Sequence, residues 1–233
     1  MIIGKGLIAS RFESNEDYHL LSDKPIIFAS GVSNSAETDE KAYNRERQLL
    51  YDILSCQPAE KLIYFSTISV YDPSLEGSKY IQHKIELERY IQENHHNHLI
   101  IRTSNIVGKG GNPHTLVNYF VNAVLEGKPI KIWKNATRNI LDIDDLVKIV
   151  LFLLHMNKSG THDIYFPLSY TALALVETIG IHTGIFPKYE LINKGADYIP
   201  SATRELTGYF KFNDIAVNYS YFEKIMAKYW PNP

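Results

Sequence analysis

Short β-rich runs alternate with amphipathic helical runs along most of this sequence, and such alternation is typical of parallel strands connected by helices. The expected strands span residues 1–3, 25–29, 61–65, 98–102 and 162–166, and the expected helices span residues 7–12, 43–54, 78–92, 116–125, 144–154 and 171–183. In the helix at 43–54, for example, Leu49, Leu50, Ile53 and Leu54 share one face. We therefore predict an α/β fold with a parallel sheet.

The composition predicts a buried core, because 45% of the 233 residues are apolar and 21% are charged, which is ordinary globular usage. The formal net charge of -2 argues against a protein that binds nucleic acid by bulk electrostatics, since such proteins carry a basic surplus. The single cysteine, Cys56, excludes an intramolecular disulfide framework and a multi-cysteine metal site.

We expect neither a membrane span nor a signal peptide. The longest apolar run, residues 149–154, is far shorter than the roughly 18 residues that a spanning helix needs. Residues 1–6 are themselves an expected strand and turn. We therefore expect a cytoplasmic protein.

Three clusters have a simpler explanation than a ligand site. The histidines at 95, 96 and 98 fall in a helix-to-strand connection and are expected to form a surface turn rather than a metal site. The aspartates at 142, 144 and 145 fit a strand end followed by a helix cap. The aromatic residues at 209–212 and 219–222 fit packing within a small lobe. We expect no metal.

Gly4, Gly6 and Ala9 form a G-x-G-x-x-A pattern between the first expected strand and the first expected helix. Glycines let a backbone approach a pyrophosphate, and the helix amino terminus offers it unpaired N–H groups. An ordinary tight turn is the alternative. Asp23, about 20 residues downstream, is a candidate for holding a ribose 2′-hydroxyl, whereas Arg11 would favour a 2′-phosphate or be a solvated helix charge.

Tyr80 and Lys84 lie four residues apart in the helix expected at 78–92, so their side chains share a face. A phenol has an unperturbed pKa of about 10, and a fixed cation nearby lowers that pKa and makes the phenol a usable general acid or base. A chance pair on a helix face is the alternative. Thr67 adds a hydroxyl at the end of the preceding expected strand, where open α/β sheets gather their ligands.

Together and in this order, these segments resemble the extended short-chain dehydrogenase/reductase family, in its NAD-dependent epimerase/dehydratase branch that modifies nucleotide sugars. Residues 101–108, Ile-Arg-Thr-Ser-Asn-Ile-Val-Gly, and residues 138–145, Arg-Asn-Ile-Leu-Asp-Ile-Asp-Asp, are similar to further motifs of the family, and Glu88 falls where the family often has Glu. The resemblance implies a Rossmann-like, doubly wound parallel sheet with a shortened amino-terminal half. It implies a dinucleotide-binding domain at residues 1–160, with residues 112–137 contributing to a substrate lobe that residues 161–233 mainly form.

The resemblance implies that Tyr80 is the catalytic acid/base, that Lys84 binds the nicotinamide ribose and lowers the tyrosine pKa, and that Thr67 is the catalytic hydroxyl. The residues we assign to binding NAD or NADP are Gly4, Gly6, Leu7, Ile8, Ala9, Arg11, Asp23, Ala29, Ser30 and Lys84, and those we assign to binding a nucleotide-sugar substrate are Ser69, Asn105 and Arg138. Family members often pair through the helices that include the one carrying Tyr80, so we expect a homodimer.

Departures from the family bear on the cofactor. The first glycine of the family's G-x-x-G-x-x-G is Ile3 here and the last is Ala9. Only about 20 residues separate the glycine turn from the strand at 25–29, where the family usually has two strands and a helix. At most one short strand, residues 18–22, fits that gap. We expect a reduced, open adenosine pocket or weakened cofactor binding, and a non-catalytic sensor or scaffold is the alternative from another class.

The reaction is partly constrained by the residues after Thr67. Dehydratases of the family typically follow the catalytic Thr with Asp-Glu, whereas Ile68 and Ser69 stand here, so dehydration is disfavoured. A keto-sugar reductase and a nucleotide-sugar 4-epimerase use the same three side chains. The compact adenosine side favours a reductase, whose cofactor exchanges, over an epimerase that keeps its NAD bound.

Overall fold

The computed structural model describes residues 1–57, 59–110, 112–113, 115–195 and 202–231 of the chain. The chain forms two compact units. Unit 1 comprises Met1–Thr103 and Val147–Ile164, and unit 2 comprises Ser104–Leu146 and Tyr165–Pro233. The division into a dinucleotide-binding domain and a substrate lobe concerns function and stays a prediction.

Unit 1 contains a parallel sheet of five strands in the order β1-β2-β3-β4-β9. The strands are β1 (Ile2–Ile3), β2 (Ile26–Phe28), β3 (Leu62–Thr67), β4 (His98–Thr103) and β9 (Gly160–Ile164). This confirms the predicted Rossmann-like α/β sheet. Because all five strands run the same way, the residues that follow β1, β2, β3 and β4 meet at one edge of the sheet, which we call the carboxyl edge.

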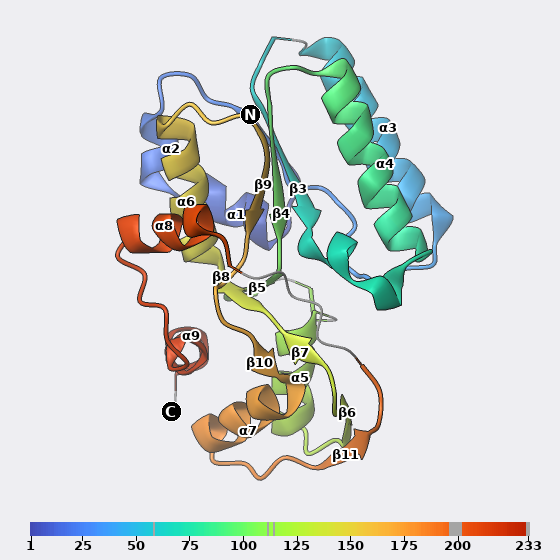
Figure 1. The fold of residues 1–233 in the computed structure, drawn as a ribbon, viewed down its shortest axis with the longest axis vertical. Coiled ribbons are helices and arrows are strands. Elements are labelled where there is room, and N and C mark those ends of the chain that lie inside the picture. The colour runs from blue at the N-terminus through green and yellow to red at the C-terminus, as the bar shows by residue number, and fades with distance from the viewer. Residues whose placement is uncertain (58, 111, 114, 196–201, 232–233) are drawn as a thin grey trace. The chain divides into compact units, whose positions relative to one another are not determined.

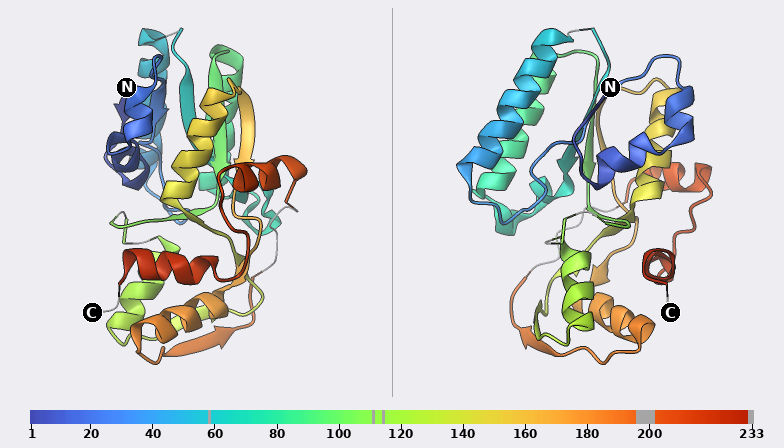
Figure 2. Two further views of the ribbon diagram at one scale, coloured as in Figure 1. Left: turned by 90° about the vertical axis from the view of Figure 1, so that its left-hand side faces the viewer. Right: turned by 180° about the vertical axis from the view of Figure 1, so that it is seen from behind.

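Helices cover both faces of this sheet (Figures 1 and 2). Helices α3 (Glu40–Cys56) and α4 (Lys79–Asn94) pack on one face, where Phe28 of β2 and Leu50 of α3 belong to one fully buried cluster. Helices α1 (Leu7–Glu13) and α6 (Ile143–His155) lie on the other face. There the ring of Phe12 lies 6.1 Å from that of Phe65. Burial on both faces explains why the strands read as continuous apolar runs.

Residues 18–22, where at most one short strand was expected, form no strand. The chain instead forms the short helix α2 (Glu16–Leu20), because Asn15 caps it by accepting a hydrogen bond from the Tyr18 N–H at 2.9 Å, and two acidic residues occupy its first turn. Tyr18 is buried and its ring packs edge-on against Phe12. In the described part of the chain, β1 is therefore the edge strand on this side of the sheet.

Unit 2 contains three pairs of strands and most of the remaining helices. The pairs are β5 (Asn105–Val107) with β8 (Ile140–Asp142), β6 (Ile130–Trp133) with β11 (Tyr189–Ile192), and β7 (Thr137–Arg138) with β10 (Tyr170–Thr171); only the last is antiparallel. The helices are α5 (Leu116–Leu125), α7 (Ala172–Thr183), α8 (Arg204–Phe212) and α9 (Tyr221–Tyr229). The helices predicted at 116–125 and 171–183 are thus confirmed, and Thr171 is the cap of the second one.

The acidic cluster at the start of α6 is a helix cap and an anchor for α9. Asp142 Oδ1 accepts from the Asp144 N–H at 2.8 Å, so the cap lies two residues before the predicted start at 144. Asp142 Oδ2 also pairs with Lys228 Nζ of α9 at 2.8 Å. Tyr221 stacks on Phe166 with ring centroids 3.8 Å apart. These aromatic residues pack within their own unit, as expected.

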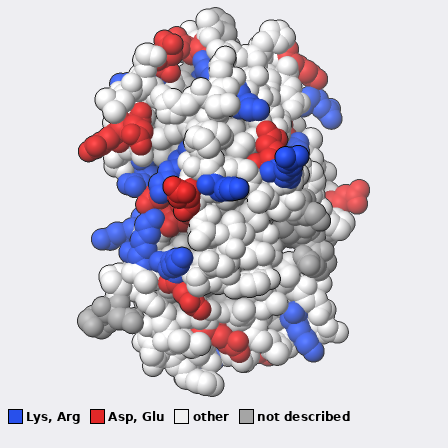
Figure 3. All heavy atoms as spheres, turned by 60° about the vertical axis from the view of Figure 1, so that its left-hand side comes forward, with Lys and Arg blue, Asp and Glu red and all other residues white. Residues whose placement is uncertain are grey.

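Three further features are the burial of a histidine, the distribution of surface charge and the hydropathy of the helices. His95 is buried, with its Nε2 2.8 Å from the Glu60 carbonyl oxygen, so the predicted surface turn is wrong at this position. On the face drawn in Figure 3, lysines and arginines stand among aspartates and glutamates rather than in a stripe of one sign. Across the described residues, no helix is long and apolar enough to span a membrane.

Candidate functional site

The glycine turn follows β1 at the carboxyl edge. Gly4 has φ of +126°, and a Cβ there would lie 2.3 Å from the carbonyl oxygen of Ala29, so only glycine fits. Gly6 is the N-cap of α1, so no side chain caps this helix. No atom lies within 4 Å of the position that a Cβ on Gly6 would take. Residues 7–8 are half-buried and Ala9 is fully buried. The open, uncapped first turn of α1 is a shape that fits a pyrophosphate.

The two candidates for reading the adenosine ribose lie in different places. Asp23 stands before β2, in a hollow lined also by Lys61 and Asn97, which stand before β3 and β4. That hollow is at the amino ends of the strands, so the structure does not bring Asp23 to the glycine turn. Arg11 lies in the last turn of α1 and donates to Ser14 Oγ at 3.4 Å.

The predicted catalytic residues Thr67 and Tyr80 both lie at the carboxyl edge. Thr67 is the last residue of β3, is 7% exposed, and accepts a hydrogen bond from the Ser69 N–H at 3.1 Å. The turn of Ile68–Tyr71 that follows packs on α4. Tyr80 lies in the first turn of α4, is 8% exposed, and belongs to a buried cluster against which Val70 of this turn packs.

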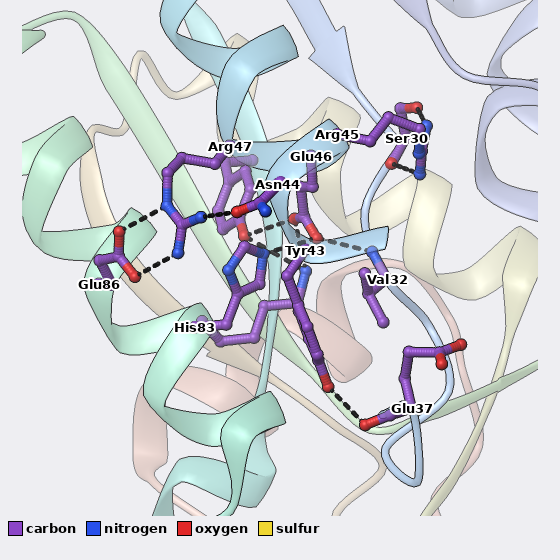
Figure 4. A network of polar contacts seen from close by, with 12 residues as sticks. Ser30, Val32, Glu37, Tyr43, Asn44, Arg45, Glu46, Arg47, His83 and Glu86 are labelled. Carbon is purple, nitrogen blue, oxygen red and sulfur yellow. Dashed lines mark hydrogen bonds and ion pairs between the residues drawn. The ribbon is translucent and has the colours of Figure 1, made fainter. Parts of the chain in front are cut away.

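Lys84 is one helical turn from Tyr80, as predicted, but its ammonium is bound inside unit 1, at the Glu46 carboxylate that Figure 4 shows. Its Nζ donates to Glu46 Oε1 at 2.8 Å and to the Tyr64 hydroxyl at 3.2 Å. Glu46 is fully buried and also accepts from the Tyr64 hydroxyl at 2.9 Å and the Val32 N–H at 2.7 Å. His83 Nε2 lies 3.0 Å from Glu46 Oε2. A buried carboxylate thus joins α3, α4, β3 and the loop after β2.

The charge state of this cluster follows from its contacts. Burial alone would raise the pKa of Glu46, but the Lys84 ammonium and the hydrogen bonds from His83, Lys84 and Val32 hold that pKa well below its usual range. Burial, with the nearby carboxylate, raises the pKa of Tyr64. Glu46 is therefore an anion at neutral pH and offsets the positive charge that Lys84 would otherwise present to Tyr80.

Glu46 was missed at the sequence level although a signal existed. It falls between Tyr43 and Leu50 at helical spacing on the buried face of α3. A charged residue on an apolar face requires a buried partner. Spacing alone does not say which cation provides it, because Lys84 is distant in sequence.

The loop after β2 lies directly against this ion pair. A Cβ on Gly31 would approach Glu46 Oε1 and Lys84 Nζ to 2.8 Å each. Ala29 and Ser30, both assigned to cofactor binding, precede this glycine in the same loop. Lys84 and the predicted cofactor-binding loop are therefore neighbours, with Gly31 as the point of closest approach.

A second network ties α4 to β4 and β9 on the same face of the sheet. Arg102 donates to Glu88 through Nη2 at 2.6 Å and to the Tyr71 hydroxyl through Nη1 at 2.7 Å. The Tyr71 hydroxyl donates to Asp163 Oδ2 at 2.8 Å, and Ser66 Oγ donates to Glu88. Glu88 and Arg102, two residues that carry the family resemblance, thus hold the helix of Tyr80 on the sheet.

Thr103 provides an unused hydroxyl at the carboxyl edge. It is the register partner of Thr67 across β3 and β4 and is 6% exposed. Its Oγ1 is buried and has no hydrogen-bond partner among the described residues. A buried hydroxyl without a partner costs roughly 1–3 kcal/mol, so a ligand that hydrogen-bonds it here would recover that energy.

The remaining predicted substrate residues are divided between the units. Asn105 and Arg138 both lie in unit 2, where Asn105 Nδ2 donates to the Asn139 carbonyl at 2.9 Å and Arg138 Nη1 donates to the Thr137 carbonyl at 2.8 Å. Ser69 is half-buried in the turn after Thr67, in unit 1. Their roles in binding phosphates or sugar stay predictions.

A family of known proteins matches more than half of the chain. The sequence model of the NAD dependent epimerase/dehydratase family matches residues 23–166. A search of curated protein sequences gave no match.

Several solved structures share the fold. UDP-N-acetylglucosamine 4-epimerase from Methanobrevibacter ruminantium is 15% identical, with a TM-score of 0.71 over 94% of this chain and 80% of that one. UDP-glucose 4-epimerase from Thermus thermophilus, solved with NAD, is 16% identical, with a TM-score of 0.68 over 92% and 80%. dTDP-4-dehydrorhamnose reductase from Bacillus anthracis, solved with NADP, is 17% identical, with a TM-score of 0.69 over 87% and 78%.

Proposed function

Because the chain belongs to the NAD dependent epimerase/dehydratase family, we propose that it is an NAD(P)-dependent oxidoreductase that reduces a keto group on a nucleoside-diphosphate sugar. The observation that carries the proposal is the joint position of Thr67 and Tyr80 at the carboxyl edge, the same edge of the sheet that holds an open glycine turn. Similar folds include nucleotide-sugar epimerases and a reductase solved with NADP.

The chain's own residues would move the proton of this reaction. A bound reduced nicotinamide supplies a hydride to the keto carbon. The Tyr80 hydroxyl donates its proton to the keto oxygen as negative charge develops there, and the Thr67 hydroxyl hydrogen-bonds the same oxygen and orients it. No acid follows Thr67, since Ile68 and Ser69 stand there, so reduction rather than elimination of water is the expected outcome.

Two alternatives remain alongside the reductase. A nucleotide-sugar 4-epimerase would use the same side chains with a tightly held NAD. A non-catalytic relative is favoured by one specific observation: Glu46 holds Lys84 in a buried ion pair, with the Lys84 side chain 3% exposed. A lysine bound in this way does not reach a nicotinamide ribose unless the loop at Gly31 moves.

The test separates the three functions. Purified protein would be denatured and its supernatant searched for NAD by mass spectrometry, and turnover of UDP- and dTDP-linked 4-keto sugars would be followed with NADH and NADPH. We expect no retained NAD, turnover by the wild type, and loss of turnover in Tyr80→Phe with cofactor affinity retained. Retained NAD would favour the epimerase, and unchanged turnover in Tyr80→Phe would refute the mechanism. No binding of either cofactor would favour the non-catalytic relative.

A further inference from the structure

Arg45 holds the loop after β2 from the exposed side of α3. Its Nη1 donates to Ser30 Oγ at 3.0 Å, and its Nη2 donates to the Ser30 carbonyl oxygen at 2.9 Å (Figure 4). A guanidinium carries five N–H donors in a rigid plane. The two bonds to Ser30 therefore fix the plane of the group and leave other N–H groups for a further acceptor.

These bonds place a positive charge beside the glycine turn. Ser30 directly follows Ala29, whose carbonyl oxygen would be 2.3 Å from a Cβ on Gly4. Of two consecutive loop residues, Ala29 therefore lies against the glycine turn and Ser30 binds the guanidinium. Both Gly4 and Ser30 follow their strands at the carboxyl edge, where a dinucleotide would lie.

The acidic side chains at the start of α3 and in the loop before it have partners other than Arg45. Glu37 Oε1 accepts from the N–H groups of Thr38 and Asp39, and Glu40 pairs with Lys79 at 2.6 Å. The ion pairs of the described residues include none to Arg45. By contrast Arg47, two residues further along the same helix, is paired with Glu86 at 2.7 Å.

We propose that Arg45 is the residue that selects NADP(H) over NAD(H), by pairing with the 2′-phosphate of the adenosine ribose. The inference rests on the proposed function, because it requires a dinucleotide at the glycine turn. An oriented guanidinium is the group best suited to a phosphate, which it meets through parallel charge-assisted hydrogen bonds. The carboxylate expected to hold an unphosphorylated ribose, Asp23, lies at the opposite end of the strands.

The architecture explains why the selecting residue would come from α3. In the described chain β1 is the edge strand, and α2 occupies the sequence where a further strand was expected. The adenosine side is therefore left to the glycine turn, the loop after β2 and the side chains that border this loop. Arg45 is the side chain that contacts the loop with a free positive charge.

The test is a titration of wild type, Arg45→Gln and Arg47→Gln with NADPH and NADH, followed by nicotinamide fluorescence at low and physiological ionic strength. We expect the wild type to bind NADPH about 10- to 100-fold more tightly than NADH, as one charge-assisted phosphate contact allows. Arg45→Gln should lose that factor for NADPH and keep its affinity for NADH. Arg47→Gln should keep the wild-type preference for NADPH over NADH. Added salt should reduce the ratio of the two affinities in the wild type, because it screens the charge of the phosphate.

An equal loss of NADPH and NADH binding in Arg45→Gln would show that Arg45 only holds the loop at Ser30, and would overturn the inference. Equal affinities in the wild type would overturn the inference and leave the proposed function intact. A preference that persists in Arg45→Gln would show that another residue selects the cofactor and would overturn the assignment. Binding of neither dinucleotide would overturn the inference together with the dinucleotide-dependent function. Retained NADH binding in Arg45→Gln shows that the variant is folded at the site.

Discussion

Replacing Glu46 with Gln tests the buried cluster most directly, because the side chain keeps its shape and loses its charge. In the wild type each carboxylate oxygen serves two partners: Lys84 Nζ and the Tyr64 hydroxyl at Oε1, and the Val32 N–H and His83 Nε2 at Oε2. Whichever oxygen becomes the amide nitrogen, the two groups that faced it lose their acceptor.

The expected magnitude follows from these contacts. Two buried donors without an acceptor cost roughly 1–3 kcal/mol each, and breaking a buried ion pair by removing one partner costs about 3–5 kcal/mol. We therefore expect Glu46→Gln to lower the free energy of unfolding by about 3–5 kcal/mol. The matched control is Glu40→Gln on the same helix, whose pair with Lys79 is more than half exposed and contributes at most about 1 kcal/mol.

The assay must report unit 1. Both tryptophans, Trp133 and Trp230, lie in unit 2, so their fluorescence follows the other unit. Hydrogen exchange of α3 and α4 at increasing urea concentration, read by mass spectrometry, reports the unit that contains Glu46. A loss in Glu46→Gln no larger than in Glu40→Gln would refute the argument.

The difference in stability between the wild type and Glu46→Gln should depend on pH. The pKa of Glu46 is lowered on folding, so its carboxylate stabilises the folded chain fully above the unfolded carboxyl pKa of about 4.3. That stability is lost as the pH falls below this value toward the folded pKa. The difference in stability between wild type and Glu46→Gln should therefore shrink below about pH 4, and a difference independent of pH would contradict the reasoning.

Two further substitutions probe other contacts. Gly31→Ala should destabilise the chain by about 1–3 kcal/mol, because the new Cβ meets the buried ion pair at 2.8 Å. The control is Gly208→Ala, which lies in a helix with no atom near the new Cβ and should be neutral or stabilising. Thermal unfolding measures both variants, and equal losses of stability would contradict this prediction. Asp142→Asn should cost about 1–2 kcal/mol, because Lys228 is 40% exposed and keeps a second carboxylate. Trp230 fluorescence during urea unfolding measures that loss, and an unchanged midpoint would show that the Asp142–Lys228 pair does not hold α9.

The sequence by itself determined the alternation of elements and the local part of the site. Apolar periodicity predicted β2, β3, β4 and the helices α3 to α7, because side-chain period and capping are properties of neighbouring residues. The same local logic placed Tyr80 one turn from Lys84 and Thr67 at a strand end. It did not foresee α2, which Asn15 caps in the gap where at most one short strand was expected.

Only the tertiary structure decided which groups meet. Lys84 and Glu46 are 38 residues apart, and Tyr71 and Asp163 are 92 residues apart, so no helical or strand period connects them. Asp23 has the sequence distance expected of a ribose ligand, but it precedes β2 and therefore stands at the amino ends of the strands. The glycine turn follows β1 and lies at the opposite edge of the sheet. An ion pair forms only between side chains that packing places in contact. The packing of α3 against α4 depends on the whole sheet and cannot be read from either segment alone.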